Sequence, residues 1–392
     1  MARNSDLELK TGSQALGDLE AAADEREERI YVASNSQLMW WKFRKHKAAL
    51  FSTAIVIVYY IVALLVEFIA PYDPQEKFVQ YKLAPPSKIR IVDSEGNWRM
   101  PFVYGTTKER DIITLRNYYI EDTSRIYPIR FFVDSDQPYK LWGLIPMETK
   151  LIGLSVPRQE QGVFFAGTDN LGRDVFSRVV YGARLSLSVG LVGVFLSLTL
   201  GVILGGVSGY YGGAADNVIQ RLIEFLRSIP NVPMWMALSA ALPPGWPIIR
   251  VYFGITVILS LLGWTGMARV VRGRFLALRE EDFVMAARLA GANEMRIILR
   301  HMLPSFTSHL IASMTLSIPG MILGETGLSF LGLGLREPAI SWGVLLSDAQ
   351  NVASVVVAPW KLWGPAVAVV VVVLAMNFMG DGLRDAADPY SR

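Results

Sequence analysis

Several apolar stretches in this chain are long enough to cross a lipid bilayer as helices. The hydrocarbon core of a bilayer is about 30 Å thick, which a helix of about 20 apolar residues spans. The sequence predicts such spans at Ala48–Ala70, Leu185–Tyr210, Ile248–Val270, Leu310–Leu331 and Leu362–Met379. Since backbone polar groups in lipid must be satisfied within the structure, these runs predict an α-helical polytopic membrane protein.

The composition agrees with a bilayer as the solvent. Of the 392 residues, 52% are hydrophobic and only 19% are charged, whereas soluble domains carry about a quarter charged residues. The chain has no cysteine, which excludes disulfides and cysteine-based metal sites, and its three histidines are scattered. It also lacks a G-x-x-x-x-G-K-S/T phosphate loop, so any ATP hydrolysis needs a separate subunit.

A further helical stretch at about 216–242 begins with charged residues and holds Pro230 and Pro233. Prolines interrupt a helix, and a broken helix at membrane depth is tolerated only where it faces protein or a water-lined cavity. Counting this stretch gives six transmembrane helices and places both termini on the same side of the membrane. Ahead of it, glycines recur every fourth residue and predict close approach of another helix to that face; they are Gly201, Gly205, Gly209 and Gly213.

The positions of basic residues predict the orientation. Residues 36–47 mix tryptophans with lysines and arginines, which is typical of an interfacial elbow helix ahead of the first span. The segment Arg269–Arg300 carries seven arginines, and basic loops stay in the cytoplasm. We therefore predict a multi-pass protein of a bacterial inner membrane with both termini cytoplasmic. Residues 1–35 are polar and acid-rich, and are predicted to form a disordered cytoplasmic tail.

Residues 72–166 form a polar insert that this orientation places on the extracytoplasmic side. Runs such as Lys88–Val92 and Tyr127–Val133 lie between turn signals and predict a small domain with some β structure. The insert is rich in aromatic residues, which could form the core of that domain, grip an external protein or cap a pathway. They include Trp98, Tyr118, Tyr119, Phe131, Phe132 and Trp142.

The cytoplasmic loop, residues 272–304, carries the most informative pattern. Small residues precede a glycine turn, and this predicts a short helix with a smooth face, a turn, and a second helix closed by a proline. The residues concerned are Ala286, Ala287, Ala290, Gly291, Ala292 and Pro304. This pattern resembles the signature loop of ATP-binding cassette (ABC) importer permeases, in which the loop is the coupling helix that docks on the ATP-binding subunit. The family pattern has Glu where this chain has Met285.

Two more segments are similar to the dipeptide/oligopeptide branch of that family, in its "C" subunit type. One is the stretch Leu328–Leu335 with the later Ser341-Trp342-Gly343. The other is residues 167–178, whose charged members are expected to form an internal ion-pair network rather than a substrate site. The motif residues there are Gly167, Asp169, Gly172, Arg173, Asp174 and Arg178.

The resemblance implies a type I ABC importer permease fold, with an elbow and first span at 36–71 and a permease core with five further helices at 167–392. It also implies the partners: a second homologous permease, two ATP-binding subunits that hold ATP and Mg, and an extracytoplasmic solute-binding protein. The function expected is transport of peptides or similar small solutes, with no catalysis, metal or cofactor in this chain.

One alternative is an ion-coupled secondary transporter, which would use carboxylates in broken helices. The sequence offers few carboxylates at mid-span. Glu325, near the outer end of the fifth span, is the candidate for lining a pathway, because ionisable groups within spans are functional by default.

Overall fold

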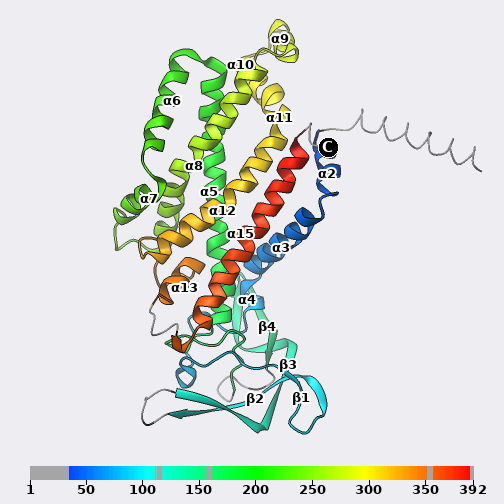
Figure 1. Ribbon diagram of the computed structural model, residues 1–392, viewed down its shortest axis with the longest axis vertical. Helices are drawn as coiled ribbons and strands as arrows, with labels where there is room; N and C mark the ends of the chain where they lie inside the picture. Colours follow the sequence, from blue (N-terminus) through cyan, green and yellow to red (C-terminus); the bar gives the residue numbers. More distant parts are fainter. Residues whose placement is uncertain are drawn as a thin grey trace, which may run out of the picture.

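The computed structural model describes residues 35–110, 112, 117–154, 156, 161–350 and 356–388. Long helices form the main body, a β-sheet lies at one end of it, and the short helix α9 (Asp282–Leu289) lies at the other (Figure 1). The predicted tail at 1–35 lies outside the described residues except for Asn35, which begins α2. The remaining helices are α2 (Asn35–Phe43), α3 (Lys47–Leu64), α4 (Val66–Ile69), η1 (Val79–Tyr81), α5 (Val175–Tyr211), α6 (Gly213–Ser228), α7 (Asn231–Ala240), α8 (Ile248–Leu278), α10 (Glu294–Arg296), the π-helix η2 (Ile297–Met302), α11 (Leu303–Ser305), α12 (Thr307–Phe330), α13 (Trp342–Asp348) and α15 (Trp360–Ala387).

Apolar helices occur where the sequence predicts them. Among the described residues, α3, α5, α8 and α15 are long and apolar enough to cross a membrane. α12 becomes a fifth when it is combined with Glu294–Ser305, from which it is bent by 69°. The predicted broken span is two helices, α6 and α7, which are separated at Ile229 and Pro230. The total of six spans stays a prediction.

The glycine pattern on α5 produces close packing against α8. A Cβ atom built on Gly201 would lie 2.6 Å from the Cβ of Met267, and one on Gly209 would lie 2.6 Å from the Cβ of Phe275. The same holds for Gly205, where the nearest neighbours include the backbone of Ala268. No larger side chain fits at these three positions without moving α8 away. Gly213, the fourth predicted member, begins α6, and a Cβ built there meets no described atom within 4 Å, so the stripe ends at Gly209.

The insert holds a four-stranded antiparallel sheet with strand order β1-β2-β3-β4. Its strands are β1 (Arg90–Val92), β2 (Trp98–Arg110), β3 (Asn117–Leu141) and β4 (Ile145–Leu154). The prediction of some β structure is confirmed, since the two predicted runs fall on β1 and β3. The sequence did not indicate β2 and β4.

The aromatic residues singled out in the sequence do not form the core of this domain. Trp98, Tyr118, Phe131, Phe132 and Trp142 are all exposed, and only Tyr119 is partly buried, so the first of the three readings is wrong for five of the six residues. Two other clusters are buried instead. One contains Val103, Tyr127, Ile129, Leu154 and Val163, and the other contains Tyr72, Phe78, Tyr81, Ala84 and Phe164. The buried aromatic residues of the insert are therefore different ones, among them Tyr72, Phe78, Tyr81, Tyr127 and Phe164.

The two ends of the described chain meet. Lys42 in α2 donates from Nζ to the backbone oxygen of Asp388, at 2.9 Å, and Phe43 packs against Ala49 and Ala386. α2 and the end of α15 lie toward the same end of the molecule as α9, and the sheet lies at the opposite end (Figure 1). Because the first and last described helices end on the same side of the helical body, the chain is expected to cross the membrane an even number of times.

Candidate functional site

The segment between α8 and α12 folds as a helix, a turn and a second helix. Ala286 and Ala287 lie in α9, which ends at Leu289 and is followed by the C-cap residue Ala290. Gly291 then adopts a φ of +75°, a left-handed conformation that glycine enters without steric cost. The glycine of the pattern therefore has a local cause: the turn needs glycine at this position.

The second helix begins with its own cap. The side chain of Asn293 accepts a hydrogen bond from the backbone N–H of Arg296, at 2.9 Å, as expected of an N-cap residue. The helix continues through α10 and η2 into α11, where it ends at Ser305, one residue after Pro304. Phe306, with φ −124°, separates it from α12. The predicted closure at Pro304 thus comes within one residue of the observed end.

The inner side of this segment is packed firmly against the helical body. Val284, Ile297 and Met302 are fully buried against Phe275 of α8 and Phe306, in one hydrophobic cluster. Ala287 and Ala292 are partly buried at the edge of the same cluster. The loop is therefore held between the ends of α8 and α12, so a force applied to it reaches both helices.

The outer side of α9 is exposed and apolar. Ala286, Ala290 and Gly291 face solvent, as does Leu289, whose side chain is 89% exposed. Phe283 and Met285 are exposed too. The sequence pattern of alanines did not point to these three larger residues, although an apolar residue on a charged, solvent-facing loop is a signal that could have found them. Together they form an uncovered apolar tip, and such surfaces mark interaction sites.

At the other end of the molecule, three of the four charged residues of the 167–178 motif are buried and paired with one another. The carboxylate of Asp169 accepts from Arg173 Nε at 2.6 Å and from Arg178 Nη1 at 2.8 Å. It also accepts from the backbone N–H groups of Leu171 and Arg173, at 2.8 and 2.9 Å. The ion-pair network expected from the sequence therefore includes Asp169, Arg173 and Arg178.

Two carboxylates far along the chain complete this network. Glu337 Oε1 lies 2.6 Å from Arg178 Nη2 and 2.8 Å from Arg173 Nη1, and Asp348 Oδ2 lies 3.4 Å from Arg178 Nη1. Burial works against ionisation of Glu337, but the Arg178 guanidinium prevails and lowers the pKa of that carboxyl. Burial and the neighbouring Glu337 raise the pKa of Asp348. The network joins the start of α5 to the α12–α13 connection.

Asp174 stands apart from the network, contrary to the expectation. Its Oδ2 accepts from the backbone N–H of Ser177 at 2.8 Å and caps the N-terminus of α5, while its Oδ1 has no hydrogen-bond partner among the described residues. Complete burial raises the pKa of this carboxyl to about 7.

The two glycines of the motif are required by the backbone conformation. Gly167 and Gly172 have φ of +70° and +82°, and their Cα atoms lie close against Ala84 and Phe78.

Glu325 is fully enclosed in the protein rather than directed into one of the cavities described below. Its carboxylate accepts hydrogen bonds from Ser329 at 2.8 Å, from Ser341 at 2.7 Å and from Ser186 at 3.1 Å. These donors come from α12 itself, from the start of α13 and from α5. The contacts tie three elements together at the sheet end of the helical body, and they supply the partners that a buried carboxylate requires.

A polar stripe on α7 lies beside two cavities, and no specific motif in the sequence indicates it. Asn231, Trp235 and Ser239 recur every fourth residue, so they share one face of the helix. Asn231 and Trp235 line a cavity of about 240 Å³ between α5, α8 and α12, and Ser239 lines another of about 360 Å³ toward the 333–339 loop. Trp235 Nε1 and Ser239 Oγ are buried without a hydrogen-bond partner among the described residues.

Comparisons with known proteins agree with the resemblance drawn from the motifs. Residues 198–392 match the family described as binding-protein-dependent transport system inner membrane component. Residues 34–86 match the N-terminal TM domain of oligopeptide transport permease C.

Individual relatives each match more of the chain than either family model does alone. The oligopeptide transport system permease protein OppC of Haemophilus influenzae is 42% identical over 59% of this chain and 72% of its own length. OppC of Bacillus subtilis is 37% identical over 62% and 77%. The dipeptide transport system permease protein DppC of Lactococcus lactis subsp. cremoris is 31% identical over 89% of both chains. These relatives give no support to an ion-coupled transporter.

Among solved structures, a chain of the inward-facing MetNI methionine ABC transporter is 20% identical, with a TM-score of 0.41 over 54% of this chain and 96% of that chain. That likeness is too remote to guide the assignment of residues. The family assignment depends on the sequence relatives, two of which exceed 35% identity over at least 72% of their own length. This chain therefore belongs to the binding-protein-dependent family of inner-membrane transport components, in its oligopeptide/dipeptide permease C branch.

Proposed function

We propose that this chain imports peptides as one of two related permease subunits that together form the translocation path. The names of its relatives, which are oligopeptide and dipeptide permeases, support peptides as the cargo. Two ATP-binding subunits would hold ATP and Mg, and an extracytoplasmic solute-binding protein would deliver the peptide. The orientation proposed is the one predicted from the arginine-rich loop, with both termini and α9 in the cytoplasm.

The single observation that carries this proposal is the two-sided character of α9. Its inner face packs against α8 and α12 through Val284, while its outer face presents small residues and the exposed Leu289. A partner that closes around the outer face would move two membrane helices at once. ATP can bias the inward- and outward-facing states only through contacts that differ between them, and α9 is placed to make such contacts. We assign the coupling role to Ala286, Ala287, Ala290, Gly291, Ala292 and Pro304 within the 272–304 loop.

For the pathway, the stripe on α7 is a stronger candidate than Glu325. Glu325 has three hydroxyl partners within the protein, whereas Trp235 Nε1 and Ser239 Oγ have none among the described residues and lie beside cavities. A peptide carries backbone carbonyls that can accept from both groups. We therefore propose that this face of α7 lines the route that a peptide follows.

The coupling proposal is tested by Ala286→Trp in the reconstituted complex. Ala286 is exposed, so a large side chain there leaves the fold of this chain intact but blocks close approach of the ATPase. We expect peptide uptake and peptide-stimulated ATP hydrolysis to fall together, while Ala286→Ser keeps both. Normal uptake by the tryptophan variant would refute the assignment.

The pathway proposal is tested by Trp235→Phe, which removes one N–H and keeps an aromatic ring. Since a neutral hydrogen bond contributes about 1 kcal/mol, we expect the KM for peptide to rise roughly fivefold. Thr199→Val is the matched control, because the Thr199 hydroxyl donates to Phe195 O within its own helix. An unchanged KM in Trp235→Phe would remove α7 from the route.

A further inference from the structure

The hairpin that joins β3 to β4 is attached to the first membrane-spanning helix. Trp142, at its tip, donates from Nε1 to the backbone oxygen of Leu64, the last residue of α3, at 2.7 Å. Phe132 of β3 lies beside Phe68 of α4, with ring centroids 6.2 Å apart. Figure 1 shows β4 next to α4, whereas β1 and β2 lie farther from the helices. The hairpin therefore reaches back along the span rather than away from it.

A break in the span explains these contacts. α3 ends at Leu64, and Leu65 leaves helical geometry with ψ of 29° before α4 begins. Carbonyl groups freed by a break must find partners, because lipid offers none. Arg184 donates to Ala63 O at 3.0 Å and to Leu64 O at 3.1 Å, and its guanidinium pairs with Glu67 at 2.5 Å.

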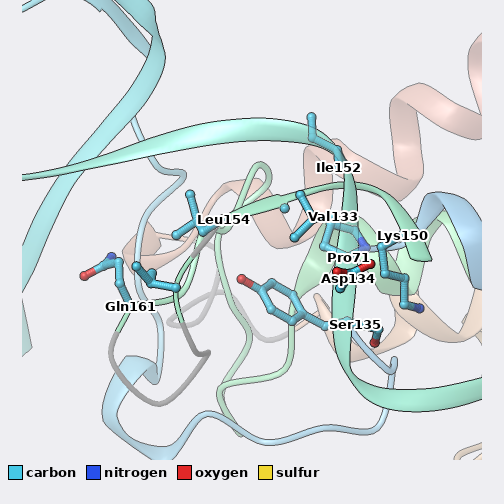
Figure 2. Close-up of a pocket in the computed structure, with 11 residues that line it drawn as sticks. Pro71, Val133, Asp134, Ser135, Lys150, Ile152, Leu154 and Gln161 are labelled. Atoms are coloured by element: carbon cyan, nitrogen blue, oxygen red, sulfur yellow. The ribbon is translucent and has the colours of Figure 1, made fainter. Parts of the chain in front are cut away.

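The hairpin supplies further donors. Besides Trp142, Lys150 of β4 donates from Nζ to Glu67 O at 2.6 Å. Figure 2 shows Lys150 close to Pro71, Asp134 and Ser135, around a cavity of about 40 Å³. That volume holds one or two waters and no peptide. The hairpin and the end of the first span thus form one hydrogen-bonded unit.

The tip of the hairpin is apolar and uncovered. Leu144 is 77% exposed, Trp142 is 45% exposed, and Ile145 and Phe132 are exposed as well. Leu64 itself is also exposed, so the apolar surface of the hairpin continues directly into that of the span. A span of about 20 residues that begins near Lys47 still includes Leu64 within the hydrocarbon or at its edge.

We propose that the β3–β4 tip, residues 141–145 together with Phe132, inserts into the lipid leaflet on the insert's side of the membrane. The ligand is the acyl and headgroup region of the bilayer. Tryptophan and lysine are the residues that occupy this layer, because an apolar body and a polar group are satisfied there at once. The hairpin shields the carbonyls of the broken span from lipid and fixes the sheet over the outer ends of the helices.

The test uses the absence of cysteine from this chain. Leu144→Cys and Ile145→Cys are each labelled with a fluorophore, and the protein is reconstituted in nanodiscs that contain lipids with a nitroxide near the top of the acyl chain. Glu95→Cys, in the exposed β1–β2 turn, is the control. We expect nitroxide lipids to quench the labels at positions 144 and 145, and iodide in the water to quench only the label at position 95. A membrane-impermeant maleimide should react only with the Glu95→Cys variant.

Two results would overturn the inference. One is quenching of both hairpin labels by iodide as strongly as the label at position 95, with no effect of nitroxide lipids. The other is protection of these positions only when the solute-binding protein is added, which would make the tip a protein contact. Neither result depends on what the complex transports, so the proposed function can stand or fall separately.

Discussion

Two regions at opposite ends of this permease, the ion-pair network around Arg178 and the outer face of α9, use charge and apolar surface in opposite ways. At the sheet end, Asp169, Arg173 and Arg178 are buried and bonded to one another and to Glu337. At the α9 end, Leu289 and its apolar neighbours on the outer face are exposed. The ion-pair network satisfies its charges within the chain, whereas the outer face of α9 presents a surface suited to a partner.

The difference separates a region that stabilises the fold from a surface that a partner can contact. A buried ion-pair network loses much free energy when one member is removed, because the remaining charges are left desolvated and unpaired. An exposed apolar tip changes folding stability little when it is altered, because it is solvated in both folded and unfolded states. Substitutions at the two ends should therefore separate stability from coupling.

The largest effect on stability is expected from Arg178→Met. This change leaves Asp169 and Glu337 with one fewer cation in a buried site, and we expect the free energy of unfolding to fall by about 3–5 kcal/mol. Unfolding in mixed micelles measures it. The control is Arg221→Ala in α6, whose pair with Glu224 is exposed and contributes at most about 1 kcal/mol. An equal loss of unfolding free energy in both variants would contradict a stabilising role for the buried network.

The next effect is the pH dependence contributed by Asp174. Its pKa is about 7 in the folded protein, above its ordinary 3.8, so the folded state holds the proton more tightly. Its stabilising contribution is complete below about pH 3.8 and is lost as the pH rises through about 7. Asp174→Asn should remove roughly 2–3 kcal/mol of the stability change between about pH 5 and pH 8. An unaltered pH profile in the asparagine variant would contradict this account.

A smaller loss is expected from Gly205→Leu in the α5–α8 contact. A Cβ at this position would lie 2.9 Å from the Cα of Ala268, so the helices must separate, at a cost of about 1–3 kcal/mol. Gly273→Ala in α8 is the matched control, since a Cβ there meets no described atom within 4 Å. It should be neutral or stabilising by up to about 1 kcal/mol. If both substitutions behave alike, the glycine stripe is not a packing surface.

The smallest effect on stability is expected from Leu289→Ser on the outer face of α9. We expect a change within about 0.5 kcal/mol, because this side chain is exposed, together with reduced peptide-stimulated ATP hydrolysis in the complex. Val284→Ser, on the buried inner face of the same helix, should instead destabilise the chain by about 2 kcal/mol. The contrast within one helix is measured by comparing unfolding with ATPase coupling for both variants.

What the sequence could predict follows from the range of each signal. Apolar runs, the glycine spacing on α5 and the turn at Gly291 are local, and each is present as predicted, apart from Gly213. The partners Glu337 and Asp348 lie 159 and 170 residues from Arg178, and no local pattern connects them. In the insert, likewise, no local pattern indicates that the exposed Trp142 meets a helix 78 residues away.

The short helix α13 illustrates the same limit. The sequence analysis predicts no helix at these residues, and the position of α13 depends on long-range contacts. Trp342 is fully buried, and its Nε1 donates to Val179 O of α5 at 3.0 Å. Ser341, which caps the helix, also donates to Glu325. Such tertiary contacts, rather than propensity, determine where a helix of seven residues is stable.

The central claim is that the outer face of α9 docks on an ATP-hydrolysing partner. Ala290→Cys in this cysteine-free chain, treated with a short thiol cross-linker in the assembled complex, tests it most directly. The account predicts a cross-link to the ATPase subunit whose yield changes between ATP-bound and nucleotide-free complexes, and none from Glu95→Cys. A cross-link from the Glu95→Cys variant but not from the Ala290→Cys variant would contradict it.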